Sequence, residues 1–211
     1  MYISHKWKHV HISIPRTGST FVNQHLNNLC HDEPFIHHAG IQTLRRLFPK
    51  IRSYTCSAFV RNPFDRLVSI YTELSENRGC AYSGRINFQM PCLLSATDAF
   101  RTRRSRFSYF VERLPESRWV TDVFFRPQRN FTCIDASVVV DCIGRYENLA
   151  FDFLMIREKY MPNEGVKKVE HGCRVRGSKR NRHYSSYYTP TAKNVAEELY
   201  HEDIKEFSYE F

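Results

Sequence analysis

The sequence switches several times between the two-residue periodicity of a β-strand and the 3.6-residue periodicity of a helix. In residues 9–30 the alternating run "HVHISI" stops at Pro15, and the stretch "PRTGST" leads into the helical pattern "STFVNQHLNNLC". A second switch follows the apolar run at residues 54–60, where "NPFDRLVSIY" places Pro63 in the first turn of a helix. Strands that alternate with helices build a mainly parallel central sheet flanked by helices. We therefore expect an α/β fold.

The remaining segments extend this alternation. We expect further strands within residues 33–38 and 138–148, and further helices at residues 40–48, 107–114, 149–160 and 189–207. Residues 78–106 show no clear periodicity, and we interpret residues 78–130 as an insertion. A chain of 211 residues is long enough for one sizeable core but short for two ordinary domains. We therefore predict a single domain over residues 1–211.

The chain is basic, with 31 Lys and Arg residues against 22 Asp and Glu residues and a formal net charge of +9. The excess is concentrated in "RTRRSR" at residues 101–106 and "RVRGSKRNR" at residues 174–182. Such clusters suit polyanions, whether glycans, nucleic acids or nucleotides with several phosphates, although a basic surface can also be simply solvated. No stretch approaches the roughly 18 apolar residues of a membrane span, so we expect none.

Two of the expected strand-to-helix junctions are suited to anions, which bind beyond the carboxyl ends of parallel strands. At "PRTGST" Gly18 lets the main chain approach a ligand. The N–H groups of residues 17–21 can then donate to a phosphate from a helix N-terminus, and two hydroxyl side chains add donors. At "VRNPFDRLVS" Arg61 ends a strand and Ser69 lies two helical turns later, so the two side chains can reach a further anion.

The loop at residues 15–20 lacks the features of a metal-dependent kinase or nucleoside triphosphatase. Such enzymes carry G-x-x-x-x-G-K-[ST], whose lysine contacts the phosphates and whose hydroxyl binds magnesium. Here there is one glycine, no GK[ST] sequence, and no acidic residue at a strand end to hold the metal. His9 and His11 alternate along a strand without a nearby acid, which argues against a metal site there. We expect phosphate binding without a metal.

Four segments together resemble sulfotransferases that use 3′-phosphoadenosine 5′-phosphosulfate (PAPS). "IPRTGST" resembles their 5′-phosphosulfate loop, P-K-[TS]-G-[ST]-[TS], and "FVRNPFDRLVSIY" resembles their 3′-phosphate motif, R-N-P-x-x-R-x-x-S. "VDCIGRYENLAFDF" is similar to their G-R-[FY]-E-N-L segment, and residues 187–211 are similar to their closing helix. The order of the four segments agrees over nearly the whole chain. The resemblance is to the carbohydrate-type branch, with its Golgi enzymes and small soluble bacterial-type members.

The resemblance implies a P-loop-like three-layer fold and a defined reaction. A sulfonyl group moves in line from PAPS to an acceptor hydroxyl, and adenosine 3′,5′-bisphosphate (PAP) leaves without the help of a metal. The family's loop around the 5′-phosphate is matched by Thr17, Gly18, Ser19 and Thr20. Its pair of residues at the 3′-phosphate is matched by Arg61 and Ser69. Relatives close a basic loop over the nucleotide, and in the matching loop of this chain Arg182 and Tyr184 are the candidates for binding the nucleotide.

The resemblance also implies two catalytic side chains. Arg16 stands where the family generally has lysine; it keeps the positive charge, but a guanidinium is always protonated and cannot readily donate a proton. The base that removes the acceptor's proton is expected to be a histidine. Relatives carry an H-A or H-x-H element after the second strand, and His38, followed by Ala39, matches it better than His37 does.

The expected acceptor is a carbohydrate hydroxyl, with residues 78–130 on the acceptor side, and no nucleic-acid partner is expected. The chain begins almost at its first strand, which leads us to expect a soluble cytoplasmic protein, or one in the Golgi lumen if an anchor precedes these residues. Two alternatives from other classes stay open. One is a non-enzymatic protein that binds polyanions such as glycans or nucleic acid, and the other is a P-loop kinase-like enzyme.

Overall fold

The computed structural model describes residues 1–26, 38–75, 103–135, 137–162 and 182–211. The chain divides into two compact units. Unit 1 comprises Met1–Arg61 and Pro127–Gly177, and unit 2 comprises Asn62–Arg126 and Ser178–Phe211. Each unit has its own hydrophobic cluster. The prediction that the chain acts as a single domain stays a prediction.

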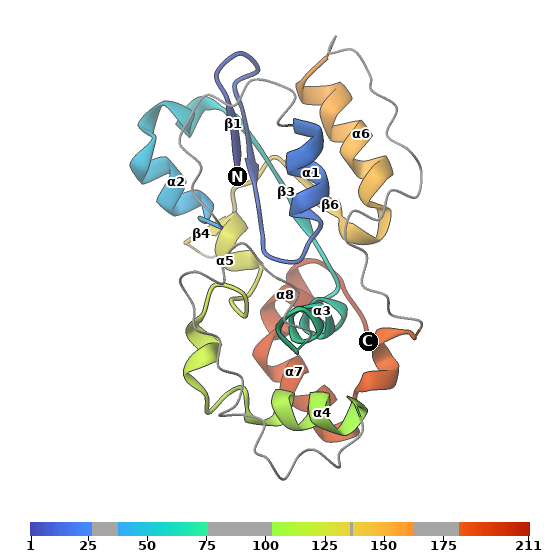
Figure 1. The fold of residues 1–211 in the computed structure, drawn as a ribbon. Helices are drawn as coiled ribbons and strands as arrows, with labels where there is room; N and C mark the ends of the chain where they lie inside the picture. Colours follow the sequence, from blue (N-terminus) through green and yellow to red (C-terminus); the bar gives the residue numbers. More distant parts are fainter. Residues whose placement is uncertain (27–37, 76–102, 136, 163–181) are drawn as a thin grey trace. The chain divides into compact units, whose positions relative to one another are not determined.

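Unit 1 is built on a four-stranded sheet (Figure 1). Its strands, in spatial order, are β1 (Tyr2–Ser4), β2 (His9–Ile12), β3 (Thr55–Val60) and β6 (Cys142–Arg145). β1 pairs with β2 in antiparallel fashion, whereas β2, β3 and β6 run parallel. A separate two-stranded sheet pairs β4 (Cys133–Ile134) with β5 (Ser137–Val138). The sheet is therefore mainly parallel, as predicted.

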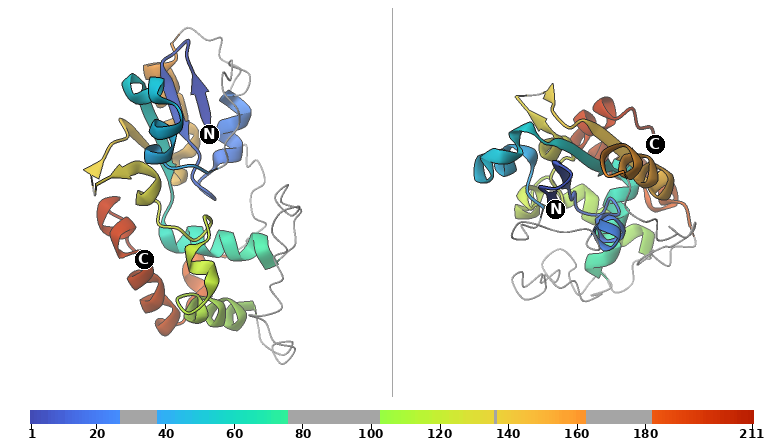
Figure 2. Two further views of the ribbon diagram at one scale, coloured as in Figure 1. Left: turned by 90° about the vertical axis from the view of Figure 1, so that its left-hand side faces the viewer. Right: turned by 90° about the horizontal axis from the view of Figure 1, so that it is seen from above.

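Helices cover both faces of the main sheet in unit 1. On one side lie α1 (Ser19–Leu26) and α6 (Leu149–Tyr160), and on the other lies α2 (Ile41–Leu47) (Figures 1 and 2). Their core includes an edge-to-face pair between Phe21 and Phe153, with ring centroids 5.6 Å apart. The short helices of this unit are η1 (Pro49–Ser53), α5 (Arg129–Thr132) and η5 (Tyr146–Asn148). This arrangement confirms the expected α/β fold.

Unit 2 is helical in its described part. Its elements are α3 (Pro63–Ser75), α4 (Arg103–Arg113), η4 (Arg118–Thr121), η6 (Tyr184–Tyr187), α7 (Pro190–Leu199) and α8 (His201–Glu206). Arg66 is 1% exposed and donates to the carbonyl oxygens of Phe124 (2.8 Å) and Arg126 (3.1 Å). The Tyr200 hydroxyl donates to the carbonyl oxygen of Phe125 (2.9 Å). Buried polar groups therefore hold three consecutive carbonyls of one segment.

Two predicted elements differ from the structure. The strand expected within residues 138–148 is registered with β3 only over Cys142–Arg145. Just before it, the Asp141 backbone N–H donates to the Cys56 carbonyl oxygen (2.9 Å), and the Asp141 carboxylate takes the place of a backbone acceptor for the Cys56 N–H (2.6 Å). The single closing helix is divided into α7 and α8 at Tyr200, whose φ of −119° and ψ of 21° are not helical. Residues 33–37 of the strand predicted at 33–38, and residues 27–30 of the first predicted helix, lie outside the described residues. None of the described helices has the length and apolar composition that crossing a membrane requires.

His9 and His11 form a buried network on one face of β2, because residues two apart in a strand share a face. Ser57 Oγ lies 2.9 Å from His9 Nε2 and 3.2 Å from His11 Nδ1. Burial lowers the pKa of His9 from 6.5 to about 4, partly offset by the Asp141 carboxylate, and burial lowers the pKa of His11 well below its usual value. Within the described residues, no group of three or more His, Cys, Asp or Glu residues is arranged to hold a metal.

This network predicts a loss of stability in mild acid. Because the pKa of His9 is lower in the folded than in the unfolded chain, the unfolded chain binds the extra proton as the pH falls below 6.5. From His9 alone, the free energy of unfolding is expected to be lower at pH 5 than at pH 8 by about 2 kcal/mol. Urea denaturation at both pH values should show this difference and should show it reduced in His9→Gln.

The matched control is His201→Gln, since His201 is exposed on α8. This variant is expected to keep the full pH dependence of the wild type. An unchanged pH dependence in His9→Gln would contradict the assignment of His9 as a buried neutral group.

Candidate functional site

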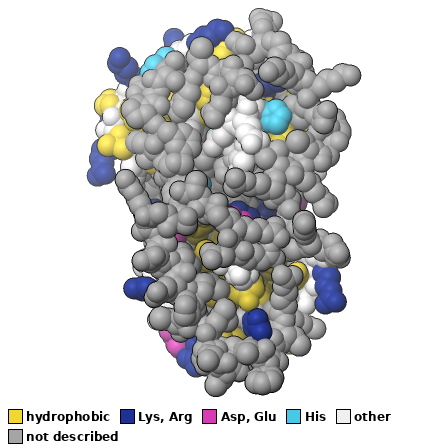
Figure 3. Space-filling model, viewed as in Figure 1, with side chains coloured by type: hydrophobic (Ala, Val, Ile, Leu, Met, Phe, Trp, Pro, Cys, Tyr) yellow, Lys and Arg dark blue, Asp and Glu magenta, His cyan; other side chains and the backbone are white. Residues whose placement is uncertain are grey.

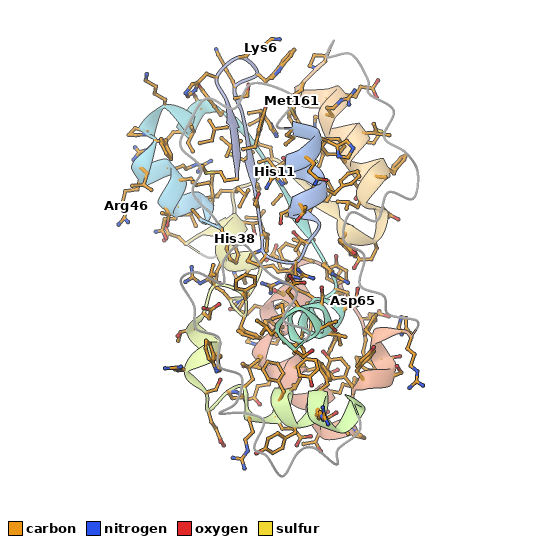
Figure 4. The ribbon with its side chains drawn as sticks, in the orientation of Figure 1. Lys6, His11, His38, Arg46, Asp65 and Met161 are labelled. Carbon is orange, nitrogen blue, oxygen red and sulfur yellow. The ribbon has the colours of Figure 1, made fainter. Side chains whose placement is uncertain are left out.

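The carboxyl ends of β2, β3 and β6 lie at one edge of the unit 1 sheet, because the three strands are parallel. Each strand leads there into a predicted motif: β2 into the loop at residues 13–18, β3 into Arg61, and β6 into Tyr146. Figure 4 shows His38 at this end of β2, opposite the β1–β2 turn that carries Lys6. The sheet topology therefore gathers several predicted site residues at one edge.

The loop between β2 and α1 contains two residues in the left-handed backbone region, Arg16 with φ of 67° and Gly18 with φ of 89°. The Thr17 hydroxyl donates to the carbonyl oxygen of Ile14 (3.0 Å), which closes the turn. The helix α1 begins at Ser19 and has no acidic residue in its first turn. Since the first N–H groups of a helix have no acceptor within it, this end of α1 is suited to an anion.

Gly18 is required by packing as well as by backbone conformation. A Cβ atom added there would lie 2.7 Å from Leu149 Cδ2 and 3.3 Å from Tyr146 Cδ2. The loop is thus packed directly against the segment that follows β6. A side chain at this position would be strained in its backbone and would also displace Leu149.

Arg61 connects the motif after β3 to this loop. Its side chain is buried, and Nη1 donates to the carbonyl oxygen of Arg16 (3.1 Å). The guanidinium carbon lies 3.9 Å from the ring centroid of Tyr146, a cation–π contact. The structure therefore brings together Arg16 and Arg61, which the sequence placed in separate motifs, and adds Tyr146 as their neighbour.

Gln128 was assigned no role in the sequence analysis, yet it contacts this site. Its side chain is fully buried, Oε1 accepts from the Arg61 backbone N–H (2.9 Å), and Nε2 donates to the Arg61 carbonyl oxygen (2.8 Å). The two residues are 67 positions apart in the sequence. A contact between residues so far apart in the chain leaves no periodic pattern in the sequence from which it could be predicted.

His38 is held in a defined orientation and tautomer. Its Nδ1 lies 2.8 Å from the carbonyl oxygen of Ser13, which follows β2. Because a carbonyl can only accept, Nδ1 carries the proton, and in the neutral ring Nε2 is the atom able to accept one. His38 has φ of 54° and is partly exposed. The other candidate base, His37, lies outside the described residues.

The charged side chains of the described residues up to Arg61 all have one sign, and Lys6 among them lies in the β1–β2 turn, away from this edge. From Met1 to Arg61 the described residues include lysines and arginines but no aspartate or glutamate. Exposed lysine and arginine side chains colour the upper and left margins of Figure 3, and the exposed basic residues of this part are Lys6, Lys8, Arg46, Lys50 and Arg52. This positive charge attracts anions to this part of the chain in general.

Comparison with known families identifies the chain. The model of the sulfotransferase family matches residues 1–210, almost the whole sequence. This chain belongs to the sulfotransferase family, in its carbohydrate and bacterial type. No curated protein and no solved structure gave a significant match.

Three predicted cofactor contacts of this sulfotransferase belong to unit 2. Ser69 is 2% exposed within α3, and Arg182 is exposed ahead of η6. The Tyr184 hydroxyl accepts from Nδ2 of Asn62 (3.2 Å), the residue that directly follows Arg61. That these three side chains bind the same nucleotide as the loop of unit 1 stays a prediction.

The packing at Gly18 predicts that Gly18→Ala destabilises the sulfotransferase. A left-handed backbone at alanine and the contact with Leu149 together are expected to lower the free energy of unfolding by roughly 1–3 kcal/mol, measured by urea denaturation. A double-mutant cycle with Leu149→Ala separates the two causes. If the steric contact matters, the double variant is less destabilised than the sum of the single variants; strictly additive changes would contradict it.

Proposed function

We propose that this sulfotransferase transfers a sulfonyl group from PAPS to a carbohydrate hydroxyl, with His38 as the base. The observation that carries the proposal is the contact between Arg61 and the carbonyl of Arg16. It joins the two anion-binding motifs of the sequence at one edge of the sheet. The membership of the sulfotransferase family supports sulfonyl transfer in general.

The residues at this edge fit a nucleotide with separate phosphate groups. In the proposal Thr17, Gly18, Ser19 and Thr20 surround the 5′-phosphate at the N-terminus of α1, and Arg61 binds the 3′-phosphate together with Ser69. Arg182 and Tyr184 close over the nucleotide. The donors are N–H groups, hydroxyls and guanidinium groups, and the loop at residues 15–20 has no GK[ST] sequence, whose hydroxyl would bind magnesium. We therefore propose that no metal takes part.

PAPS, when bound, supplies the activated sulfonyl group: a bond forms from the acceptor oxygen to sulfur while the bond from sulfur to the 5′-phosphate oxygen breaks. His38 takes the proton of the acceptor hydroxyl on Nε2, because its Nδ1 is occupied by the bond to Ser13. Arg16 stabilises the negative charge that develops on the sulfonyl and leaving oxygens. The guanidinium does so by its charge and its N–H donors rather than by giving up a proton.

A carbohydrate acceptor is supported by the type of family and by the basic character of the chain, whose formal net charge is +9. Glycans that receive sulfate groups are commonly acidic polymers, which a basic surface attracts. Part of the segment assigned to the acceptor, residues 78–102, lies outside the described residues, so the sugar and the position sulfated are left to experiment.

The proposed donor predicts metal-free binding of PAP. Calorimetric titration in the presence of EDTA is expected to show specific binding, weakened in Arg61→Ala by about 10- to 100-fold because a charge-assisted phosphate contact is lost. Arg52→Ala is the control, since Arg52 is exposed on η1. Magnesium-dependent ATP binding would favour the kinase-like alternative. Equal losses in both arginine variants would favour non-specific binding of polyanions.

The proposed base predicts a separation of turnover from binding. With labelled PAPS and a panel of sugars, polysaccharides and phenols, His38→Ala is expected to lower kcat by roughly 10²- to 10⁴-fold while the Kd for PAP stays unchanged. His37→Ala and His201→Ala are the comparison variants. Full activity in His38→Ala, or the same loss in His37→Ala alone, would remove His38 as the base.

A further inference from the structure

The side-chain amide of Gln128 pairs with the main chain of Arg61 in both directions. It accepts from the Arg61 N–H at 2.9 Å and donates to the Arg61 carbonyl oxygen at 2.8 Å. Gln128 is 0% exposed and Arg61 is 4% exposed, so water competes little for these bonds. In a β-sheet a neighbouring strand donates to the C=O and accepts from the N–H of a residue. Here one side-chain amide makes both hydrogen bonds.

The pairing lies just beyond the C-terminal end of β3. The last residue of β3 is Val60, paired with Arg145 of β6, so Arg61 lies just beyond the registered strand pairs. Bonds to both the N–H and the C=O of one residue orient the two peptide planes on either side of its Cα. The direction in which the Arg61 side chain leaves the backbone is therefore set by Gln128.

The direction matters because the Arg61 side chain makes two specific contacts. Its Nη1 reaches the carbonyl oxygen of Arg16 at 3.1 Å, and its guanidinium lies 3.9 Å from the ring centroid of Tyr146. A long side chain amplifies a small rotation at its Cα into a displacement of its end. Loss of the support by Gln128 would therefore move the guanidinium without removing it.

We propose that Gln128 is a positioning residue that holds Arg61 for recognition of the 3′-phosphate; this inference rests on the function proposed above. Gln128 touches no reacting atom and acts through the Arg61 main chain. The role requires an acceptor and a donor at the end of a side chain of this length. Asparagine is one methylene shorter, and methionine has the size without the two hydrogen bonds.

The test isolates the contribution of the 3′-phosphate to binding by comparing calorimetric Kd values for PAP and for adenosine 5′-monophosphate, which lacks this phosphate. The ratio of the two Kd values is the preference for PAP. We compare the wild type, Gln128→Met, Arg61→Ala and the double variant; Gln42→Met, at an exposed position of α2, is the matched control. Gln128→Met is expected to lower the preference by about tenfold or more, since small displacements of a binding group are costly. Gln42→Met is expected to keep the preference.

The double variant shows whether Gln128 acts through Arg61. If it does, Gln128→Met causes little further loss of preference once Arg61 is alanine. Equal weakening of both nucleotides by Gln128→Met, with the preference intact, would overturn the inference while the proposed function stands. A wild type that binds neither nucleotide would overturn the proposed function and the inference together. If Gln128→Met does not fold, Gln128→Asn is measured in the same way, with the same expected and overturning results.

Discussion

The arrangement of the candidate site depends on how a buried arginine is satisfied at the end of β3. Arg61 is 4% exposed, and an unpaired cation at such a position would be costly. Its guanidinium instead donates to the carbonyl of Arg16 and lies over the ring of Tyr146. The segments that follow β2, β3 and β6 therefore meet on one side chain.

Two of the five non-glycine residues with positive φ in the described part of the chain, Arg16 and His38, lie at this same edge. Arg16, Gly18 and His38 all have φ between 54° and 89°, a region that residues with a Cβ rarely adopt. Each is held there by contacts from other segments: Arg16 by Arg61, Gly18 by the packing of Leu149, and His38 by the carbonyl of Ser13. Strain of this kind persists only where the surroundings impose it, and it commonly marks functional sites.

Unit 2 begins with Asn62, whose side chain makes hydrogen bonds to three partners. Asn62 Oδ1 accepts from the Phe64 N–H (3.0 Å) at the start of α3, while Nδ2 donates to the Tyr184 hydroxyl (3.2 Å) and the Glu210 carbonyl (2.7 Å). The helix that carries Ser69 and the segment that carries Tyr184 are thereby tied to one amide. The residue next to Arg61 in the motif thus organises unit 2, as Arg61 itself organises the edge of unit 1.

We could predict from the sequence the alternation of strands and helices, the α/β class and the loop and arginine motifs, because these are local patterns of period, capping and small residues. Helix α6 was predicted with its observed bounds, and α7 begins at Pro190, one residue after the start of the helix predicted at residues 189–207. The break at Tyr200, the tautomer of His38 and the pairing of Gln128 with Arg61 are seen only in the folded chain. These depend on contacts between residues far apart in the chain, and such contacts leave no periodic pattern in the sequence.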